Sequence, residues 1–250
     1  MNDKYKLVNK QSNGLYQIEA LKDFGDVKKG ELGGFIEKED NLSIYGNAWV
    51  TDNAKVSGNA WVTDNAKVSG NAWVTGDIWV SDNAKISDNA WVQVNAWVSG
   101  NAKISGNAKI SGNAKVSDNV CVYGNALVYD NARVSGNAKI YGNAWVYGSA
   151  RVYDNATVCG SARVYGNAWV QGNMSTKGFI KWFSKVGSEN GTLTITIGDD
   201  RITRVSRGCF TGTLAEFKAE VEKKALDCKH RKEYLGLIKV IKGYTNDVFK

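Results

Sequence analysis

The chain of 250 residues contains a single histidine, His230, and this scarcity excludes several kinds of catalytic site. A zinc site held by three histidines cannot be built within one chain. Cys228 lies two residues before His230, but two further metal ligands are missing nearby. The sequence also has no glycine-rich phosphate loop, no serine–histidine–aspartate set and no carboxylate pair that stands out. We therefore expect no catalytic residues, no metal and no cofactor.

Long apolar stretches and a signal sequence are absent as well. No segment is long and apolar enough to cross a membrane, and the start of the chain, Met1 to Lys4, is not that of a signal peptide. The four cysteines are widely separated, which favours reduced thiols. We therefore expect a cytoplasmic protein without membrane contact. The net charge of +7 is modest for this length, so it permits an anionic partner without requiring one.

The dominant feature that is present is a six-residue repeat covering half of the chain. An aliphatic residue recurs at every sixth position from Ile44 to Val170, 22 times, without an insertion or deletion. The unit reads Val-Ser-Gly-Asn-Ala-Lys, with Trp or Arg often in place of Lys and Asp in place of Gly. A period of six is neither helical nor simply alternating, and it indicates a parallel β-helix.

Strand alternation assigns each column of the repeat to the inside or the outside. In the segment that begins at Ala48, Ala48 and Val50 point one way, and Trp49 and Thr51 point the other. The Ala and Val columns almost never carry a polar residue, so we expect them to face inward. The Gly-Asn and Asp-Asn pairs form the corners, since Gly and Asn enter the left-handed backbone region most readily. We expect the stacked Asn side chains to form an amide ladder along one corner.

The repeat resembles the left-handed β-helix of the hexapeptide-repeat proteins, in which three hexads make one triangular coil. The left-handed sense is implied by this resemblance alone, because parallel crossovers otherwise favour right-handed connections. The 21 intervals from Ile44 to Val170 then give about seven coils, a rod about 34 Å long at roughly 4.8 Å per layer. The predicted fold class is therefore mainly β, a left-handed parallel β-helix of about seven triangular coils.

Both ends of such a rod need a cover, and the flanking segments have the composition for it. Residues 1–41 carry scattered apolar positions and turn signals, and we predict an N-terminal cap there, followed by the β-helix over residues 42–173. Residues 174–250 predict a small α+β domain. Its expected strands span residues 179–186, 192–197 and 202–210. Its first helix is expected from Thr213, which forms a capping box with Glu216, to about Lys224, and a second helix is expected to continue from Tyr234 to Ile241.

Many hexapeptide-repeat proteins are acyltransferases in which a histidine acts as general base, and this resemblance implies a test. Here the only histidine lies outside the repeat, and the period never breaks to form a substrate loop. An acyltransferase-like enzyme would require His230 to fold back onto the rod. We expect His230 to be a solvated residue at the start of the last helix instead, so a non-enzymatic role is the leading hypothesis.

The outward positions of the repeat vary in residue type, whereas the interior positions are uniform. Residues 18 apart stack above one another, and the third face reads Trp61, Trp79, Trp97, Lys115, Arg133, Arg151, Trp169. The second face reads Lys55, Trp73, Trp91, Lys109, Leu127, Trp145, Arg163, and the first begins with Trp49 and is mostly Lys. The column after Val becomes Tyr-rich late in the repeat. The candidate binding surface consists of Trp61, Trp79, Trp97, Trp73, Trp91, Lys115, Arg133, Arg151, Tyr129, Trp145 and Tyr147.

Three interpretations of these columns stay open. Trp and Tyr suit strand surfaces, so repeat duplication alone would preserve them. Trp is also enriched at binding hot spots, which favours a protein interface with another protein or with a second copy as a dimer or trimer. Aromatic residues beside Lys and Arg suit single-stranded nucleic acid or glycans, although the weak net charge and the lack of a recognition motif argue against nucleic acid.

Two segments outside the repeat resemble a family common in bacteriophages and prophages, some of whose members are labelled acyltransferases. The first is residues 23–43, DFGDVKKGELGGFIEKEDNLS, and the second is residues 207–214, RGCFTGTL, with Lys229-His230 and Glu233-Tyr234 further on. The resemblance covers nearly the whole chain and brings no catalytic residues with it. It implies a phage-associated protein and is uninformative about chemistry. Together with the single histidine outside the repeat, it leads to the hypothesis of a non-catalytic phage or prophage binding protein in the cytoplasm of the host bacterium, extended to the inhibition of a host defence factor. A structural part of the virion is a further alternative.

Overall fold

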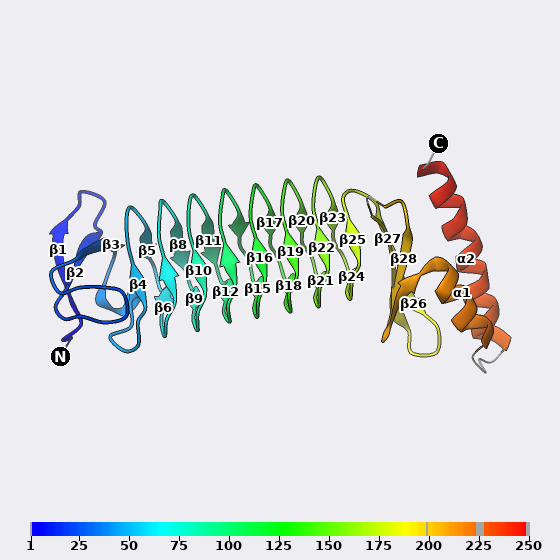
Figure 1. Cartoon of the computed structure of the whole chain (residues 1–250), viewed down its shortest axis with the longest axis horizontal. Coiled ribbons are helices and arrows are strands. Elements are labelled where there is room, and N and C mark those ends of the chain that lie inside the picture. Colours follow the sequence, from blue (N-terminus) through cyan, green and yellow to red (C-terminus); the bar gives the residue numbers. More distant parts are fainter. Residues whose placement is uncertain (1, 199, 224–227, 249–250) are drawn as a thin grey trace.

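The computed structural model describes residues 2–198, 200–223 and 228–248, and it shows an elongated molecule (Figure 1). Parallel coils stack along the long axis, N-terminal strands lie at one end, and a small sheet with two helices lies at the other. The fold is a β-solenoid of about eight turns. This is one turn more than the hexads alone predict, because a strand before the first hexad and a strand after the last join the stack.

The solenoid has three faces, each a parallel sheet. The first face consists of β4 (Trp49–Val50), β7 (Lys67–Val68), β10 (Lys85–Ile86), β13 (Lys103–Ile104), β16 (Cys121–Val122), β19 (Lys139–Ile140), β22 (Thr157–Val158) and β25 (Ser175–Thr176). The second consists of β3 (Leu32–Ile36), β5 (Lys55–Ser57), β8 (Trp73–Gly76), β11 (Trp91–Val94), β14 (Lys109–Ile110), β17 (Leu127–Val128), β20 (Trp145–Val146) and β23 (Arg163–Val164). The third consists of β6 (Trp61–Val62), β9 (Trp79–Val80), β12 (Trp97–Val98), β15 (Lys115–Val116), β18 (Arg133–Val134), β21 (Arg151–Val152) and β24 (Trp169–Val170).

The interior is the apolar stack that the repeat predicts. Ala48, Val50 and their equivalents in every coil are fully buried and form one continuous hydrophobic cluster along the rod. Successive coils are joined by backbone hydrogen bonds between positions about 18 residues apart, such as the bond from the Lys67 amide to the Ala84 carbonyl at 2.9 Å. The register of the outward columns therefore follows directly from the six-residue period.

The corners turn at Gly or Asp residues in the left-handed backbone region, such as Asp52 at φ 58° and Gly70 at φ 66°. An Asp at this position has a second role, because its carboxylate accepts a hydrogen bond from the corner amide one coil further on. Asp52 Oδ2 accepts from the Gly70 amide at 2.9 Å, and most of the other corner aspartates repeat this contact. Asn side chains stack beside these turns, as in the bond from Asn47 Nδ2 to Asn65 Oδ1 at 2.9 Å. Such bonds occur along all three corners, not along one.

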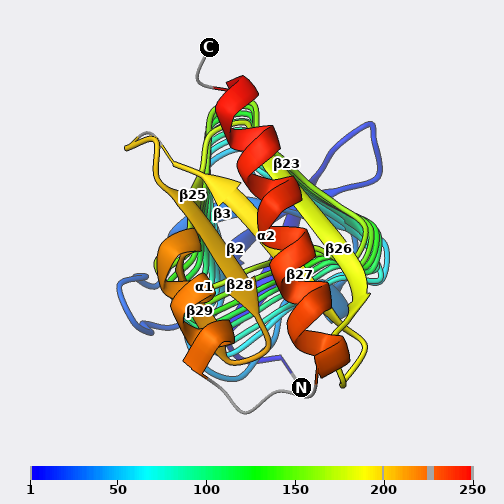
Figure 2. The same cartoon turned by 90° about the vertical axis from the view of Figure 1, so that its right-hand side faces the viewer.

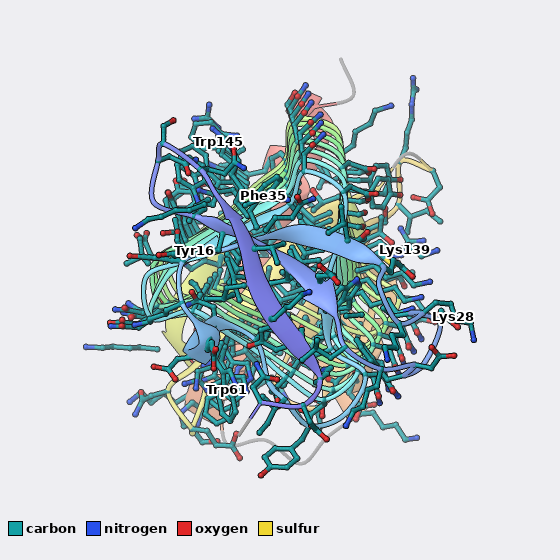
Figure 3. All side chains as sticks on the ribbon, turned by 90° about the vertical axis from the view of Figure 1, so that its left-hand side faces the viewer. Tyr16, Lys28, Phe35, Trp61, Lys139 and Trp145 are labelled. Atoms are coloured by element: carbon teal, nitrogen blue, oxygen red, sulfur yellow. The ribbon has the colours of Figure 1, made fainter. Side chains whose placement is uncertain are left out.

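The N-terminal strands close the first coil and share its core. β1 (Tyr5–Lys10), β2 (Tyr16–Ala20) and β3 form an antiparallel extension of the second face, and a 3-10 turn, η1 (Glu39–Asn41), leads into the hexads. Figure 3 looks onto this end and shows these strands crossing over the coils. Trp49 stands in the outward column of the first face, in register with Lys67 as predicted, but the N-terminal segment covers it. Its side chain is 3% exposed, because the rings of Phe24 and Tyr5 cover it at centroid distances of 5.3 and 6.4 Å.

The other end is closed by an antiparallel sheet with helices on its outer side. The sheet runs β26 (Ile180–Val186), β27 (Gly191–Ile197), β28 (Thr203–Arg207) and β29 (Phe210–Thr213) in that order. The helices α1 (Leu214–Lys223) and α2 (Cys228–Val248) lie across the face that points away from the rod (Figure 2). Val186, Leu193, Val205, Phe217 and Ile241 belong to a hydrophobic cluster separate from that of the solenoid.

Two of the predictions for this end need correction. The strand expected over residues 202–210 is a hairpin of two strands, because Gly208 adopts φ 57° and turns the chain between β28 and β29. The last helix starts at Cys228 and runs to Val248, so it is longer than the predicted segment from Tyr234 to Ile241. The capping box is confirmed, since the Glu216 amide donates to Thr213 Oγ1 at 3.2 Å and the Thr213 amide donates to Glu216 Oε2 at 2.7 Å.

Candidate binding surface

One column of the third face presents three indoles in register. Trp61, Trp79 and Trp97 occupy equivalent positions of neighbouring strands and are 40%, 42% and 42% exposed. The ring centroids are 5.1 Å apart between Trp61 and Trp79 and 5.4 Å apart between Trp79 and Trp97. A monomeric protein rarely leaves several large apolar side chains side by side in contact with water. This cluster is therefore the main apolar patch of the rod.

The same column continues as a row of cations. Lys115, Arg133 and Arg151 follow Trp97 in register, and Lys115 Nζ lies 5.3 Å from the centroid of the Trp97 ring. In the part of the chain that the structure describes, none of the three forms a salt bridge. Like charges directly opposite one another on neighbouring strands repel. We name the six residues from Trp61 to Arg151 in this column the third-face stripe.

The remaining candidate residues lie on the second face. Trp73 and Trp91 stack with ring planes 3° apart, and Lys109 Nζ lies 5.3 Å from the Trp91 ring. Further along the rod, Tyr129 stacks on Tyr147 and meets the edge of Trp145. Burial raises the pKa of Tyr129 above its usual value. Trp91 and Trp145 are only partly exposed, whereas Trp73 is 43% exposed.

The eleven candidate residues therefore divide between two sides of the rod. Figure 3 shows Trp61, Trp145 and Lys139 projecting away from the rod in three different directions, one from each face. The stripe unites Trp61, Trp79, Trp97, Lys115, Arg133 and Arg151, while Trp73, Trp91, Tyr129, Trp145 and Tyr147 form a second, separate row. A single flat partner can contact the stripe without touching the second row.

The packing of the rings bears on the kind of ligand that the stripe can bind. Nucleic-acid bases bind aromatic side chains by stacking on an open ring face. Trp97 has Trp79 stacked on one side and Lys115 placed over its ring, and the Trp145 ring is likewise covered by Arg163 at 4.5 Å. These faces are occupied within the chain. Trp79 and Trp97 therefore have at least one ring face covered by a neighbour in the same column.

The sequence pattern missed Tyr45, which lies one coil before the tryptophans. Tyr45 is 78% exposed and shares a shallow depression with Trp61, Leu42 and Ile44 at the N-terminal end of the stripe. It occupies the position after Ile44, so it belongs to the column that becomes Tyr-rich only much later in the repeat. The signal was present in the sequence, but the residue stands alone at the start of its column.

His230 lies in the first turn of α2 and is partly buried, at the end of the molecule that carries the helices. Among the described residues, no group of three or more His, Cys, Asp or Glu side chains is placed to hold a metal ion.

Cys121, Cys159 and Cys209 are free thiols, as the sequence predicts. The described helices include none with the length and apolar character needed to span a membrane.

The fold and its columns define the class as a β-solenoid built from hexapeptide repeats. Residues 120–136 and 150–164 match the family model described as the YdcK β-solenoid repeat. Both matched segments lie inside the rod, over β16 to β18 and β21 to β23. The chain is therefore similar to this repeat over part of its coils. Comparison with curated proteins finds no match.

Proposed function

We propose that the protein is a non-catalytic binding protein whose rigid solenoid presents the third-face stripe to a protein partner. The observation that carries the proposal is the composition of one straight column, in which three exposed indoles are followed by three cations that form no salt bridge with any described residue. The stacked coils fix the spacing of these side chains, so little conformational entropy remains to be lost when a partner binds.

The partner that fits the stripe has an apolar patch next to an acidic one. Exposed tryptophans supply most of the affinity at many protein interfaces, because they bury a large apolar area. Acidic groups opposite Lys115, Arg133 and Arg151 would relieve the repulsion within the basic half and would steer the encounter. The expected partner is thus a protein with a linear surface, apolar at one end and acidic at the other, on the order of 30 Å long.

The biological setting follows from the resemblance to phage and prophage proteins. We propose that the partner is a protein of the host bacterium, met in the host cytoplasm, and that a defence factor inhibited by docking fits this setting. We also propose the left-handed winding that the hexapeptide-repeat proteins imply, which an experimental electron-density map would test.

Affinity capture of tagged protein from infected cells tests the proposal, with the wild-type chain beside three variants. Replacement of Trp61, Trp79 and Trp97 by Ser is expected to weaken the captured complex by about a hundredfold or more. Replacement of Lys115, Arg133 and Arg151 by Gln is expected to slow association and to remove most of its salt dependence. The matched control replaces the stacked pair Tyr123 and Tyr141 of the first face by Ser.

Retained affinity in the triple Trp variant would contradict the proposal, and equal loss in the control would indicate a general effect on the rod. Thermal stabilisation by acetyl-coenzyme A that is lost in His230→Ala would favour an acyltransferase-like enzyme instead. The molar mass in solution separates self-association from partner binding, because a dimer or trimer through the stripe would dissociate in the triple Trp variant without any host protein.

A further inference from the structure

The rod and the C-terminal sheet meet at a cavity of about 420 Å³ whose lining comes from both parts. Ser149, Arg151 and Trp169 come from the last coils of the third face, whereas Glu189, Thr192 and Arg207 come from the C-terminal sheet and its hairpin. Arg151 also lines a smaller depression of about 270 Å³ together with Arg133. The basic half of the stripe thus leads into this cavity.

Arg207 is a buried cation with few partners. Its side chain is 9% exposed, and Nη2 donates to the Val186 carbonyl at 2.7 Å. Its Nε is buried and has no hydrogen-bond partner among the described residues. Its nearest carboxylate is Glu189, with Nη1 and Oε2 3.8 Å apart, and the Glu189 side chain is 81% exposed. A guanidinium that is removed from water normally requires hydrogen-bond acceptors or a carboxylate to offset the loss of hydration. Arg207 has few of them, so the free-energy cost of burying its charge is poorly offset.

The backbone of the hairpin between β26 and β27 lies close against this guanidinium. A Cβ added to Gly191 would lie 2.7 Å from Arg207 Nη1, and a Cβ added to Gly187 would lie 3.1 Å from Nη2. Two glycines in one hairpin therefore allow the backbone to approach the guanidinium closely on two sides. The position of Arg207 at the wall of the cavity depends on this local backbone.

Arg151 supplies the second cation. Its guanidinium carbon lies 5.0 Å from the centroid of the Trp169 ring, which orients the planar group. With Arg151 and Arg207 against Glu189, the cavity wall carries two positive charges and one negative charge. Hydroxyl donors from Ser149 and Thr192 line the same space. Arginine is the side chain best suited to bind carboxylate and phosphate groups through two parallel hydrogen bonds.

We propose that this cavity binds the oxyanion group of a small ligand, a phosphate or a carboxylate, between Arg151 and Arg207. Glu189 is the carboxylate of the chain itself that stands near Arg207 when no ligand is bound, and an incoming oxyanion displaces it. The site lies beyond the tryptophans of the stripe and goes beyond the proposed partner binding, because it takes a small anion and depends on Arg207 and Glu189.

Titration calorimetry on the full chain, with inorganic phosphate and with acetate at constant ionic strength, tests the proposal. Tighter binding of phosphate identifies a phosphate site, and tighter binding of acetate identifies a carboxylate site. Arg151→Gln is expected to weaken the preferred anion by about tenfold. Glu189→Gln is expected to strengthen it by about threefold, because an exposed ion pair that competes with the ligand is removed.

The matched control is Arg163→Gln, since Arg163 also lies over a tryptophan, Trp145, but outside the cavity. This variant is expected to bind the anion as the wild type does. The triple Trp→Ser variant of the stripe is expected to keep its anion affinity as well, so failure of partner capture and failure of anion binding are distinguishable. Absence of saturable binding of either anion to the wild type would overturn the proposal, as would equal affinity in the wild type and Arg151→Gln.

Discussion

The two ends of the solenoid are closed in different ways. At the N-terminal end, β3 pairs in parallel with β5, and Tyr5, Ile18 and Trp49 belong to the same hydrophobic cluster as the coils. At the C-terminal end, β27 lies against β24 and β25, but the C-terminal sheet packs with its helices around a cluster of its own. The first cover is part of the rod, and the second is a unit placed against it.

The contacts at the two joints show the same difference. Lys4 is almost fully buried at the first joint, and its Nζ donates to the carbonyls of Ser43 and Ala48, each at 2.9 Å. The second joint combines apolar contacts, such as the edge contact between the rings of Tyr165 and Trp182 at 4.3 Å, with polar ones. The polar contacts include the bonds from Gln171 Nε2 to the Gly208 carbonyl and to Thr211 Oγ1, both at 2.9 Å. The second joint is also where both parts line one cavity, to which the rod contributes Arg151 and the C-terminal sheet contributes Arg207.

The largest expected effect comes from removing the aromatic side chain that seals the first joint. Trp49→Ala deletes a buried ring covered by Phe24 and Tyr5, and we expect it to lower the free energy of unfolding by about 4 kcal/mol. Trp169→Ala, at the other end, removes a partly exposed ring and is expected to cost about 1 kcal/mol. Denaturant unfolding followed by circular dichroism compares the two. Equal costs would contradict the view that the first joint is part of the core.

The sequence could predict the solenoid because its period is unbroken. Each column was assigned by counting in sixes, and the pairing of Trp61 with Trp79 and of Lys115 with Arg133 follows that count. The burial of Trp49 could not be predicted in this way, because it depends on a contact with Phe24, a residue outside the repeat. The six-residue period determines the register in which each coil pairs with its neighbour, but it gives no information about the segment that covers the first coil.

The candidate site was predictable to a similar extent. The columns gave the stripe in full, including the change from indoles to cations after Trp97. The cavity at the second joint was not predictable, because Arg207 reaches it only through the hairpin turn at Gly208, and the residues were expected to form one strand. Contacts between parts that are distant in sequence and have no shared period require the three-dimensional structure.

The next effect tests whether the second cover unfolds independently of the rod. Leu193 is fully buried in the cluster of the C-terminal sheet, so Leu193→Ala is expected to cost about 3 kcal/mol through the cavity that it leaves. Hydrogen exchange should show lower protection in β26 to β29, with the protection of the central coils unchanged, because each coil contacts only its neighbours. Lower protection along the whole rod would show that the two clusters unfold as one unit.

The smallest expected effect is a pH dependence that belongs to the first joint. Burial lowers the pKa of Lys4 to about 8, below its usual value of 10.5, so the folded state disfavours the charged form. Stability is therefore expected to rise by about 2 kcal/mol as the pH increases from about 8 toward 10, where the unfolded chain still holds the proton that the folded chain releases. Burial raises the pKa of Tyr5, so above about pH 10 the unfolded chain loses the phenol proton first and stability falls again.

Unfolding midpoints measured between pH 7 and 11, roughly the range over which Lys4 and Tyr5 titrate, check this profile. Lys4→Met is the informative variant, because it keeps the length of the side chain and removes the titrating group. Its overall stability is expected to be lower, since the carbonyls of Ser43 and Ala48 lose their donor. Its rise between pH 8 and 10 should vanish while the fall above pH 10 persists. A rise that persists in Lys4→Met would show that another group causes the pH dependence, and that the burial of Lys4 at the first joint does not.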